Sequence, residues 1–119
     1  MKRIVPMLML VLVSYTTEAS WYSVEACKVN PDRRCPTANG SSLYKLEAQA
    51  VPYCANWHNR FGQRLKVTNL ANGRSTECVV LDRGPNRRLE GRNLDLSRLA
   101  FERIGDLRDG VINVEVTEL

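Results

Sequence analysis

Asp82 is the residue whose setting most favours chemistry. It follows the apolar run Val79-Val80-Leu81 and precedes Arg83-Gly84-Pro85. The apolar run predicts a buried strand, and the glycine and proline after it predict a sharp turn. A carboxylic acid held rigidly at such a strand end can give a proton to a breaking bond and later take one back. The alternative is a structural carboxylate that pairs with Arg83 or caps the turn.

The single histidine lies beside a tryptophan in a polar stretch. His58 follows Trp57 and precedes Asn59, which predicts an accessible imidazole able to serve as acid, base or hydrogen-bonding group. The ring of Trp57 is suited to cover the apolar face of a sugar ring. The alternatives are a solvated histidine and a buried core tryptophan.

The four cysteines, Cys27, Cys35, Cys54 and Cys78, predict two disulfides. No two of them have the close spacing of a zinc knuckle, and His58 is the one imidazole that could join them, so a zinc site is not expected. Three pairings are possible. We favour Cys27 with Cys35, which closes a short polar loop, and Cys54 with Cys78, which joins two distant segments.

The first residues have the pattern of a secretory leader. Lys2 and Arg3 precede an apolar run over residues 4–13, and Thr17-Glu18-Ala19 places small residues at the −3 and −1 positions of a cleavage site. The run is too short for a stable membrane anchor, which needs about 20 residues. We therefore predict a signal peptide, residues 1–19, and one secreted or periplasmic domain, residues 20–119.

Size and charge narrow the class of partner. A domain of this length is large enough for one hydrophobic core and gains from disulfide cross-links. The net charge of +4 suits an anionic polymer, and nucleic acid is not expected behind a secretory leader. We predict a monomer, because no pattern indicates a helical seam or a strand built for assembly.

Several segments predict the elements that must position these side chains. Residues 20–24 predict a strand, residues 28–42 an irregular loop, and residues 46–50 a short helix or strand. Residues 64–70 and 75–81 predict a hairpin, with Asn72-Gly73 supplying positive φ angles in the turn. Residues 94–105 predict a helix that Asp95 or Ser97 caps and Gly105 ends. Residues 111–116 predict a final strand.

The motif Asp82-Arg83-Gly84-Pro85, taken with its neighbours, resembles the rare lipoprotein A family. Val-Thr-Asn-Leu-Ala-Asn-Gly, residues 67–73, precedes it, and Gly-Arg-Asn-Leu-Asp-Leu-Ser, residues 91–97, follows it. Residues 20–22 and 110–116 agree with the family as well. The resemblance implies a mainly β fold, a six-stranded double-psi β-barrel with one or two short helices, related in outline to expansins and barwin-like proteins.

The resemblance also implies an activity. Enzymes of that family are lytic transglycosylases, which cleave between N-acetylmuramic acid and N-acetylglucosamine without water and leave a 1,6-anhydro end. It assigns both proton transfers to Asp82. The partner is then peptidoglycan or a related glycan, and the resemblance implies no metal and no organic cofactor.

This chain departs from the family at two positions. Asn56 stands where the family's catalytic histidine usually lies, and His58 follows two residues later. After Thr37-Ala38-Asn39-Gly40 the family typically has a Glu and then an Asp, whereas Glu47 is the nearest acid here.

Two interpretations follow from these departures. In the first, a cleft is rebuilt around catalytic Asp82 and His58. Residues predicted to contact the substrate are Asn56, Trp57, Glu47 and Arg83; Gly84 and Asp95, the latter paired with Arg83, are structural. In the second, the fold is a glycan-binding barrel of the expansin kind, or a secreted effector or inhibitor that binds a protein, and the full catalytic set has been lost.

Overall fold

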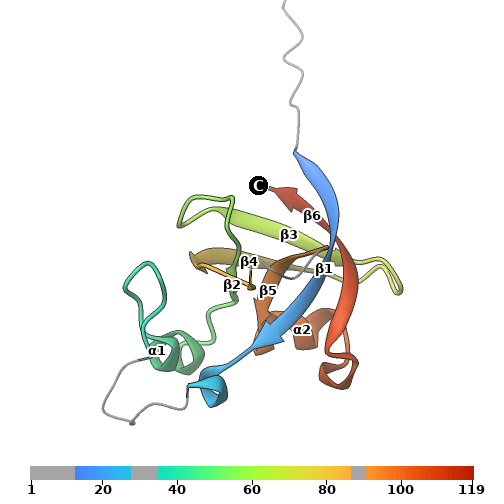
Figure 1. Ribbon diagram of the computed structural model, residues 1–119. Helices are drawn as coiled ribbons and strands as arrows, with labels where there is room; N and C mark the ends of the chain where they lie inside the picture. The colour runs from blue at the N-terminus through green and yellow to red at the C-terminus, as the bar shows by residue number, and fades with distance from the viewer. Residues whose placement is uncertain (1–12, 28–34, 87–90) are drawn as a thin grey trace, which may run out of the picture.

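The computed structural model describes residues 13–27, 35–86 and 91–119, and these form a closed barrel of six strands (Figure 1). Going around the barrel, the strands follow the order β1-β5-β2-β4-β3-β6. The strands are β1 (Ser14–Tyr22), β2 (Tyr53–Ala55), β3 (Arg64–Asn69), β4 (Ser75–Asp82), β5 (Arg92–Ser97) and β6 (Val111–Glu118). The helices are α1 (Leu43–Ala48) and α2 (Arg98–Ile104), with 3-10 turns η1 (Val24–Ala26) and η2 (Leu107–Asp109). The predicted six-stranded barrel with short helices is confirmed.

Strand pairing is mixed. β1 runs parallel to β5 and antiparallel to β6, and β2 runs parallel to β4 and antiparallel to β5. β3 is antiparallel to both β4 and β6. Parallel neighbours need long crossover connections, and these crossovers bring loops that are distant in the sequence to one end of the barrel.

Alternation of apolar and polar residues builds the core. In β3, Leu65 and Val67 are buried whereas Lys66 is exposed, and in β6 Val114 and Val116 are buried beside exposed Glu115. This period of two is what a strand with one buried face requires. Helix α2 adds Ala100, Phe101 and Ile104 to the same core.

The predicted hairpin is β3 and β4, paired from Arg64↔Val79 to Thr68↔Ser75. We predicted positive φ angles for Asn72 and Gly73 in the turn. Gly73 has one, +75°, and Asn72 does not. Asn69 and Asn72 have a further task, because the side-chain Nδ2 of each donates to the carbonyl oxygen of Ile104, at 2.8 and 2.9 Å. The turn is thereby joined to the last carbonyl of α2.

The helix predicted over residues 94–105 is wrong for its first part. Leu94 and Leu96 belong to β5, where both are fully buried and Asp95 between them is partly exposed. Two apolar residues separated by one polar residue occur in strands and also at the border of the apolar face of a helix. This segment is a strand because its backbone pairs with β1 and β2. Helix α2 begins after Ser97, whose Oγ accepts from Ala100 N, as one of the two predicted caps.

Both favoured disulfides are confirmed. Cys54–Cys78 joins neighbouring strands β2 and β4 inside the core, with a Cα–Cα distance of 5.7 Å. Cys27–Cys35 joins the residue after η1 to the segment before α1. Residues 28–34 of the predicted irregular loop lie outside the described residues.

The first strand extends upstream of the domain boundary that we predicted at Ser20. β1 begins at Ser14 and pairs with β6 from Ser14↔Thr117 to Ser20↔Val111. Thr17 and Ala19 are buried, and Thr17 Oγ1 donates to Gly91 O at 3.0 Å. Cleavage after Ala19 stays a prediction, and it would remove most of this strand.

We expect a chain of residues 20–119 to lose the cooperative thermal unfolding that a chain of residues 13–119 shows, because it lacks most of the β1–β6 pairing. Circular dichroism during heating measures the difference, and intact-mass analysis of the exported protein gives its natural first residue. Equal unfolding midpoints for the two chains would contradict this dependence on residues 14–19.

Removing the core disulfide is expected to cost more stability than removing the surface one. Loop-closure entropy assigns about 3.4 kcal/mol to a cross-link spanning 24 residues and about 2.5 kcal/mol to one spanning 8. Cys54→Ala/Cys78→Ala also leaves a cavity among fully buried core residues, whereas Cys27 and Cys35 are only partly buried against the smaller second cluster, so their removal leaves less unfilled space. Urea unfolding of both double variants measures the order, and a larger loss for the surface pair would contradict it.

Candidate active site

Asp82 is the last residue of β4, and its carboxylate is fixed by donors from three segments. Tyr22 of β1 donates its hydroxyl to Oδ2 at 2.9 Å. The backbone N–H groups of Ala38 and Arg83 donate to Oδ1 at 2.8 and 2.9 Å. The side chain is partly exposed. Asp82 is therefore held in one orientation while it remains accessible, as a group that transfers protons must be.

The loop that carries Ala38 is held by its own hydrogen bonds. Its ends meet in a bridge between Pro36 and Ser42, and Thr37 N donates to Ser41 O at 2.8 Å. Asn39 N donates to Leu81 O at 3.3 Å, which ties the loop to the end of β4. The Ala38 N–H thus reaches Asp82 from a preformed loop rather than from a free segment.

Tyr22 is supported in turn by Tyr53 and Glu47. The rings of Tyr22 and Tyr53 meet edge to face, with centroids 5.4 Å apart. Burial raises the pKa of Tyr22 far above its ordinary value, and the negative charge of Asp82 raises it further. Tyr22 therefore remains protonated and serves as a hydrogen-bond donor to Asp82.

Glu47 of α1 has a structural position. Its Oε1 accepts from the Tyr53 hydroxyl at 2.8 Å and from Val24 N at 3.0 Å. Burial raises the pKa of Tyr53, as does its hydrogen bond to Glu47. These contacts fix α1 and η1 around Tyr53, and they do not support the substrate contact that we predicted for Glu47.

Asp95 brings a second carboxylate to the region. Ala55 of β2 is paired with Asp82 on one side and with Asp95 on the other, so the backbones of the two acids are roughly 10 Å apart, two strand spacings. Ser20 Oγ donates to Asp95 Oδ1 at 2.6 Å. Burial raises the pKa of Asp95; the Ser20 hydrogen bond and the charge of Arg92 oppose this effect, and the charge of Asp82 adds to it.

Arg83 pairs with a loop and not with Asp95, which corrects the ion pair that we predicted. Its Nη1 donates to the carbonyl oxygens of Asn56 and Asn59, at 3.3 and 2.8 Å. Its guanidinium carbon lies 3.9 Å from the centroid of the Phe61 ring, within the range of a cation–π contact. Arg83 therefore fastens the β2–β3 loop, residues 56–63, to the end of β4.

Trp57 and His58 lie in the same loop. The indole Nε1 of Trp57 donates to Pro85 O at 2.6 Å, and 38% of the residue remains exposed, so it is not a core tryptophan. His58 is exposed. Gly84 has a φ of +157° and lies against Ala55, so a side chain at this position would be strained.

Asn56 is fully buried, and this is contrary to the substrate contact that we predicted. Its Nδ2 donates to Asn59 Oδ1 at 2.7 Å, and its Oδ1 accepts from Asn59 N at 3.1 Å. Asn59 Nδ2 continues the network to Glu118 Oε1 at 2.7 Å. The amide at this position therefore shapes the loop from within.

Sequence reasoning missed Tyr22 and Ala38 as partners of Asp82, and Phe61 as a partner of Arg83. The pairing of β1 with β5 that brings Tyr22 to this end has no local signal in the sequence. A backbone N–H such as that of Ala38 has no sequence signature at all. Only the crossover topology could have identified these contacts.

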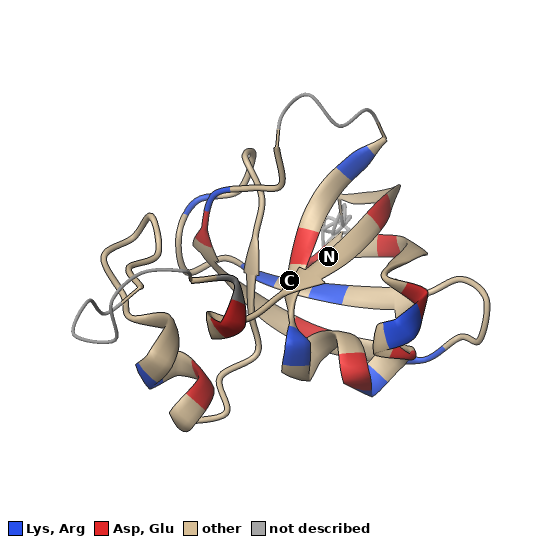
Figure 2. Cartoon of the chain, turned by 60° about the horizontal axis from the view of Figure 1, so that its bottom comes forward, with Lys and Arg blue, Asp and Glu red and all other residues tan. Residues whose placement is uncertain are grey.

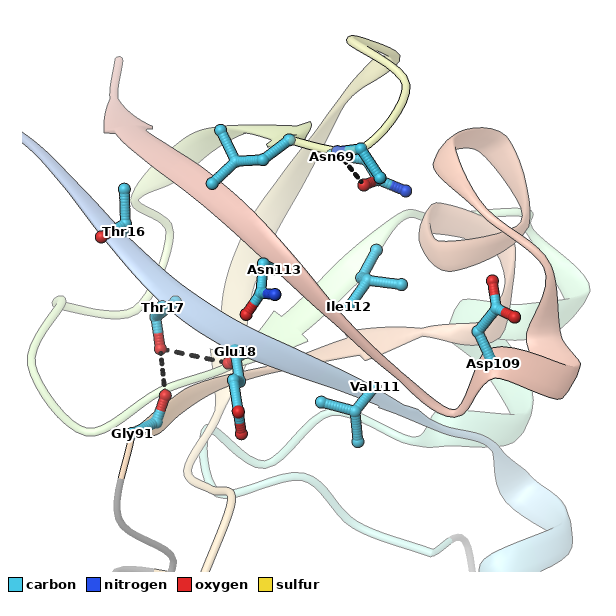
Figure 3. Close-up of a pocket in the computed structure, with 11 residues that line it drawn as sticks. Thr16, Thr17, Glu18, Asn69, Gly91, Asp109, Val111, Ile112 and Asn113 are labelled. Carbon is cyan, nitrogen blue, oxygen red and sulfur yellow. Dashed lines mark hydrogen bonds between the residues drawn. The ribbon is translucent and has the colours of Figure 1, made fainter.

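The described residues also form a wide hollow of about 910 Å³ over β1, β6 and the hairpin turn. Figure 3 shows Glu18 and Asp109 among the residues that line it. It contains neither Asp82 nor the 56–63 loop. Within the described ranges, no group of His, Cys, Asp and Glu is arranged to hold a metal ion.

Charges are mixed over the surface. Figure 2 shows acidic and basic residues interspersed along α2 and the neighbouring strands. One such pair is Arg98 and Glu102, with Nε and Oε1 3.1 Å apart. Among the helices that the structure describes, none is long and apolar enough to cross a bilayer.

Comparison with known proteins gives relatives for both the sequence and the fold. The chain is 48% identical over 67 residues to a protein of Aquifex aeolicus named "Probable endolytic peptidoglycan transglycosylase RlpA", a match covering 56% of this chain and 29% of that protein. The chain therefore spans less than a third of that relative.

Solved structures agree in fold. The apo expansin of Clavibacter michiganensis superposes with a TM-score of 0.66 at 21% identity, covering 90% of this chain and 50% of the expansin. A mutant of the same expansin, solved in complex with cellohexaose, superposes with a TM-score of 0.63 at 20% identity, and the match again covers 90% of this chain and 50% of the expansin.

A family model described as "Lytic transglycolase" matches residues 14–116. The match includes β1 to β5 in full and β6 as far as Val116. The closed barrel and the residues around Asp82 lie within that match. The chain therefore belongs to the lytic transglycolase family of double-psi β-barrels, and it is similar to the rare lipoprotein A proteins that its motifs resemble.

Proposed function

We propose that this chain is an extracytoplasmic lytic transglycosylase that cleaves peptidoglycan, with Asp82 as the group that transfers the proton. The observation that carries the proposal is the anchoring of Asp82 at the end of β4 by three hydrogen bonds. Family membership and the printed names of the relatives support the reaction type. The secretory pattern of the first residues supports the location.

The reaction needs one group that first gives and then accepts a proton. Asp82 protonates the oxygen that links C1 of N-acetylmuramic acid to N-acetylglucosamine, and the C1–O bond breaks. The C6 hydroxyl of the same muramic acid attacks C1 and returns its proton to Asp82. A 1,6-anhydro end forms, and no water is consumed.

The hydrogen bonds of Asp82 assign different roles to its two oxygens. Oδ1 accepts two backbone N–H groups and therefore keeps acceptor character. The proton is then carried on Oδ2, which faces the Tyr22 hydroxyl, a group able to donate or accept. Tyr22 thus supports Asp82 in both protonation states.

His58 is the second catalytic residue of the proposal, in place of the family's histidine. Its loop is fastened to the Asp82 segment through Arg83 and through the contact of Trp57 with Pro85. An exposed imidazole on this loop can contact the sugar hydroxyls near Asp82 and help to move the C6 proton.

Asp82→Asn is expected to lower the rate of anhydro-product formation by at least about 10²-fold, because the amide keeps the hydrogen-bonding shape but cannot transfer the proton. Mass spectrometry of material released from purified peptidoglycan, intact or stripped of stem peptides, measures 1,6-anhydromuramoyl ends. Binding to insoluble cell wall should be largely kept.

The same assay distinguishes a transglycosylase from a barrel that only binds glycan. A wild-type protein that sediments with the wall but releases no anhydro ends is a glycan-binding barrel, which would overturn the catalytic proposal. An unchanged rate in the Asp82→Asn variant would instead remove Asp82 from the mechanism.

His58→Ala is expected to slow product formation by about 10²-fold if the imidazole transfers a proton, while His58→Gln separates proton transfer from hydrogen bonding. Counting anhydro ends by mass spectrometry gives both rates. A His58→Gln rate as low as that of His58→Ala would show that proton transfer is lost, because glutamine keeps hydrogen bonding only. Rates equal to that of the wild type would assign His58 to the solvated surface.

A further inference from the structure

Two large aromatic side chains are left exposed in one short loop. Trp57 is 38% exposed and Phe61 is 41% exposed, and both belong to the β2–β3 loop, residues 56–63. Exposed aromatic area is costly in water unless a partner covers it. In Figure 1 this loop lies on the same side of the barrel as α1, opposite the β3–β4 turn.

Both aromatic residues are fixed by the segment that follows Asp82. Trp57 donates its indole N–H to Pro85 O at 2.6 Å. Phe61 lies under the guanidinium of Arg83, 3.9 Å from its centroid. Arg83 also donates to the carbonyl oxygens of Asn56 and Asn59, so the loop is held at two further points. The aromatic residues are therefore positioned beside the candidate acid before any ligand binds.

The shape and charge of this surface fit a sugar chain. Each pyranose ring has an apolar face of C–H groups and a rim of hydroxyls, and an aromatic ring covers the first while leaving the second in water. Arg83 lies on the Phe61 ring, and Arg60 and His58 are exposed in the same loop. These donors suit the carboxylates carried by muramic acid residues and stem peptides.

We propose that Trp57 and Phe61 form a sugar-stacking subsite next to Asp82, which binds pyranose rings of the glycan strand adjoining the cleaved bond. This inference rests on the proposed function, because the ligand is the same strand. It adds Phe61 as a binding residue and makes Arg83 the positioning residue that holds the loop.

Binding is measured in the Asp82→Asn background, so that turnover does not remove the probe. The probe is a preparation of peptidoglycan glycan strands stripped of stem peptides, and calorimetry measures their binding to the protein. Trp57→Ala and Phe61→Ala are each expected to weaken binding about tenfold, the effect of losing one favourable aromatic contact. Trp57→Phe should restore most of the affinity, because it keeps an aromatic face.

The control is Leu70→Ala. Leu70 is 52% exposed and lies next to the hairpin turn, away from Asp82. This variant removes an exposed apolar side chain without touching the proposed subsite, so its affinity should equal that of the parent. Thermal unfolding of every variant checks that the barrel is intact.

Tryptophan fluorescence gives an independent readout. The other tryptophan of the described residues, Trp21, donates to Leu107 O at 3.0 Å and packs near Phe101, on another part of the barrel. A spectral shift on adding glycan strands should therefore be present in the parent and absent in Trp57→Phe. A shift that persists in Trp57→Phe would contradict stacking on Trp57.

The outcomes separate this inference from the function on which it rests. If Trp57→Ala and Phe61→Ala bind glycan as tightly as the parent while the wild type still forms anhydro ends, the subsite is wrong and the activity stands. If the two variants lose binding and the wild type forms no anhydro ends, the subsite is supported, the catalytic proposal is wrong, and the protein is a glycan-binding barrel. If neither the parent nor the wild type binds glycan and no anhydro ends form, both are overturned.

Discussion

Closure of the barrel by β1 is the constraint on which the rest of the structure depends. This strand pairs with β5 on one side and with β6 on the other, so each of the six strands has two neighbours. A closed sheet leaves no unpaired edge to recruit another chain. Closure also brings residues 14–22 beside residues 92–97 and 111–118, which no local interaction could do.

The candidate site inherits its precision from this closure. Tyr22 reaches Asp82 because β1 crosses to the end of the barrel where β4 ends, and Asp95 reaches the same level because β5 lies between β1 and β2. The side chain of Arg83 then fastens the neighbouring loop. Acid, supporting hydroxyl and loop are therefore parts of one rigid framework rather than separate flexible pieces.

Local signals predicted much of the fold, and long-range contacts account for the rest. The hairpin and the last strand follow from alternation and turn residues. The sequence predicted two disulfides and allowed three pairings, of which the favoured one is present. Leu94 and Leu96 satisfy both helical and strand spacing, so only their pairing decides. The family resemblance led us to predict Glu47, Asn56 and Arg83 as substrate-contacting residues. It could not show that their polar groups instead bind a tyrosine hydroxyl, a second asparagine and backbone carbonyl oxygens.

The contacts of Asn69 and Asn72 indicate that the motif over residues 67–73 has a structural role rather than a catalytic one. Both side chains bind the same carbonyl of Ile104 and so close the C-terminal end of α2 against the hairpin. Neither residue lies in the segments that hold Asp82. A search that recognises this stretch therefore detects the architecture of the barrel, and it would recognise an inactive binding protein as readily as an enzyme. Under the proposed mechanism, the residues that bear on catalysis are Asp82 and the 56–63 loop, which carries Asn56 where the family resemblance leads one to expect a histidine.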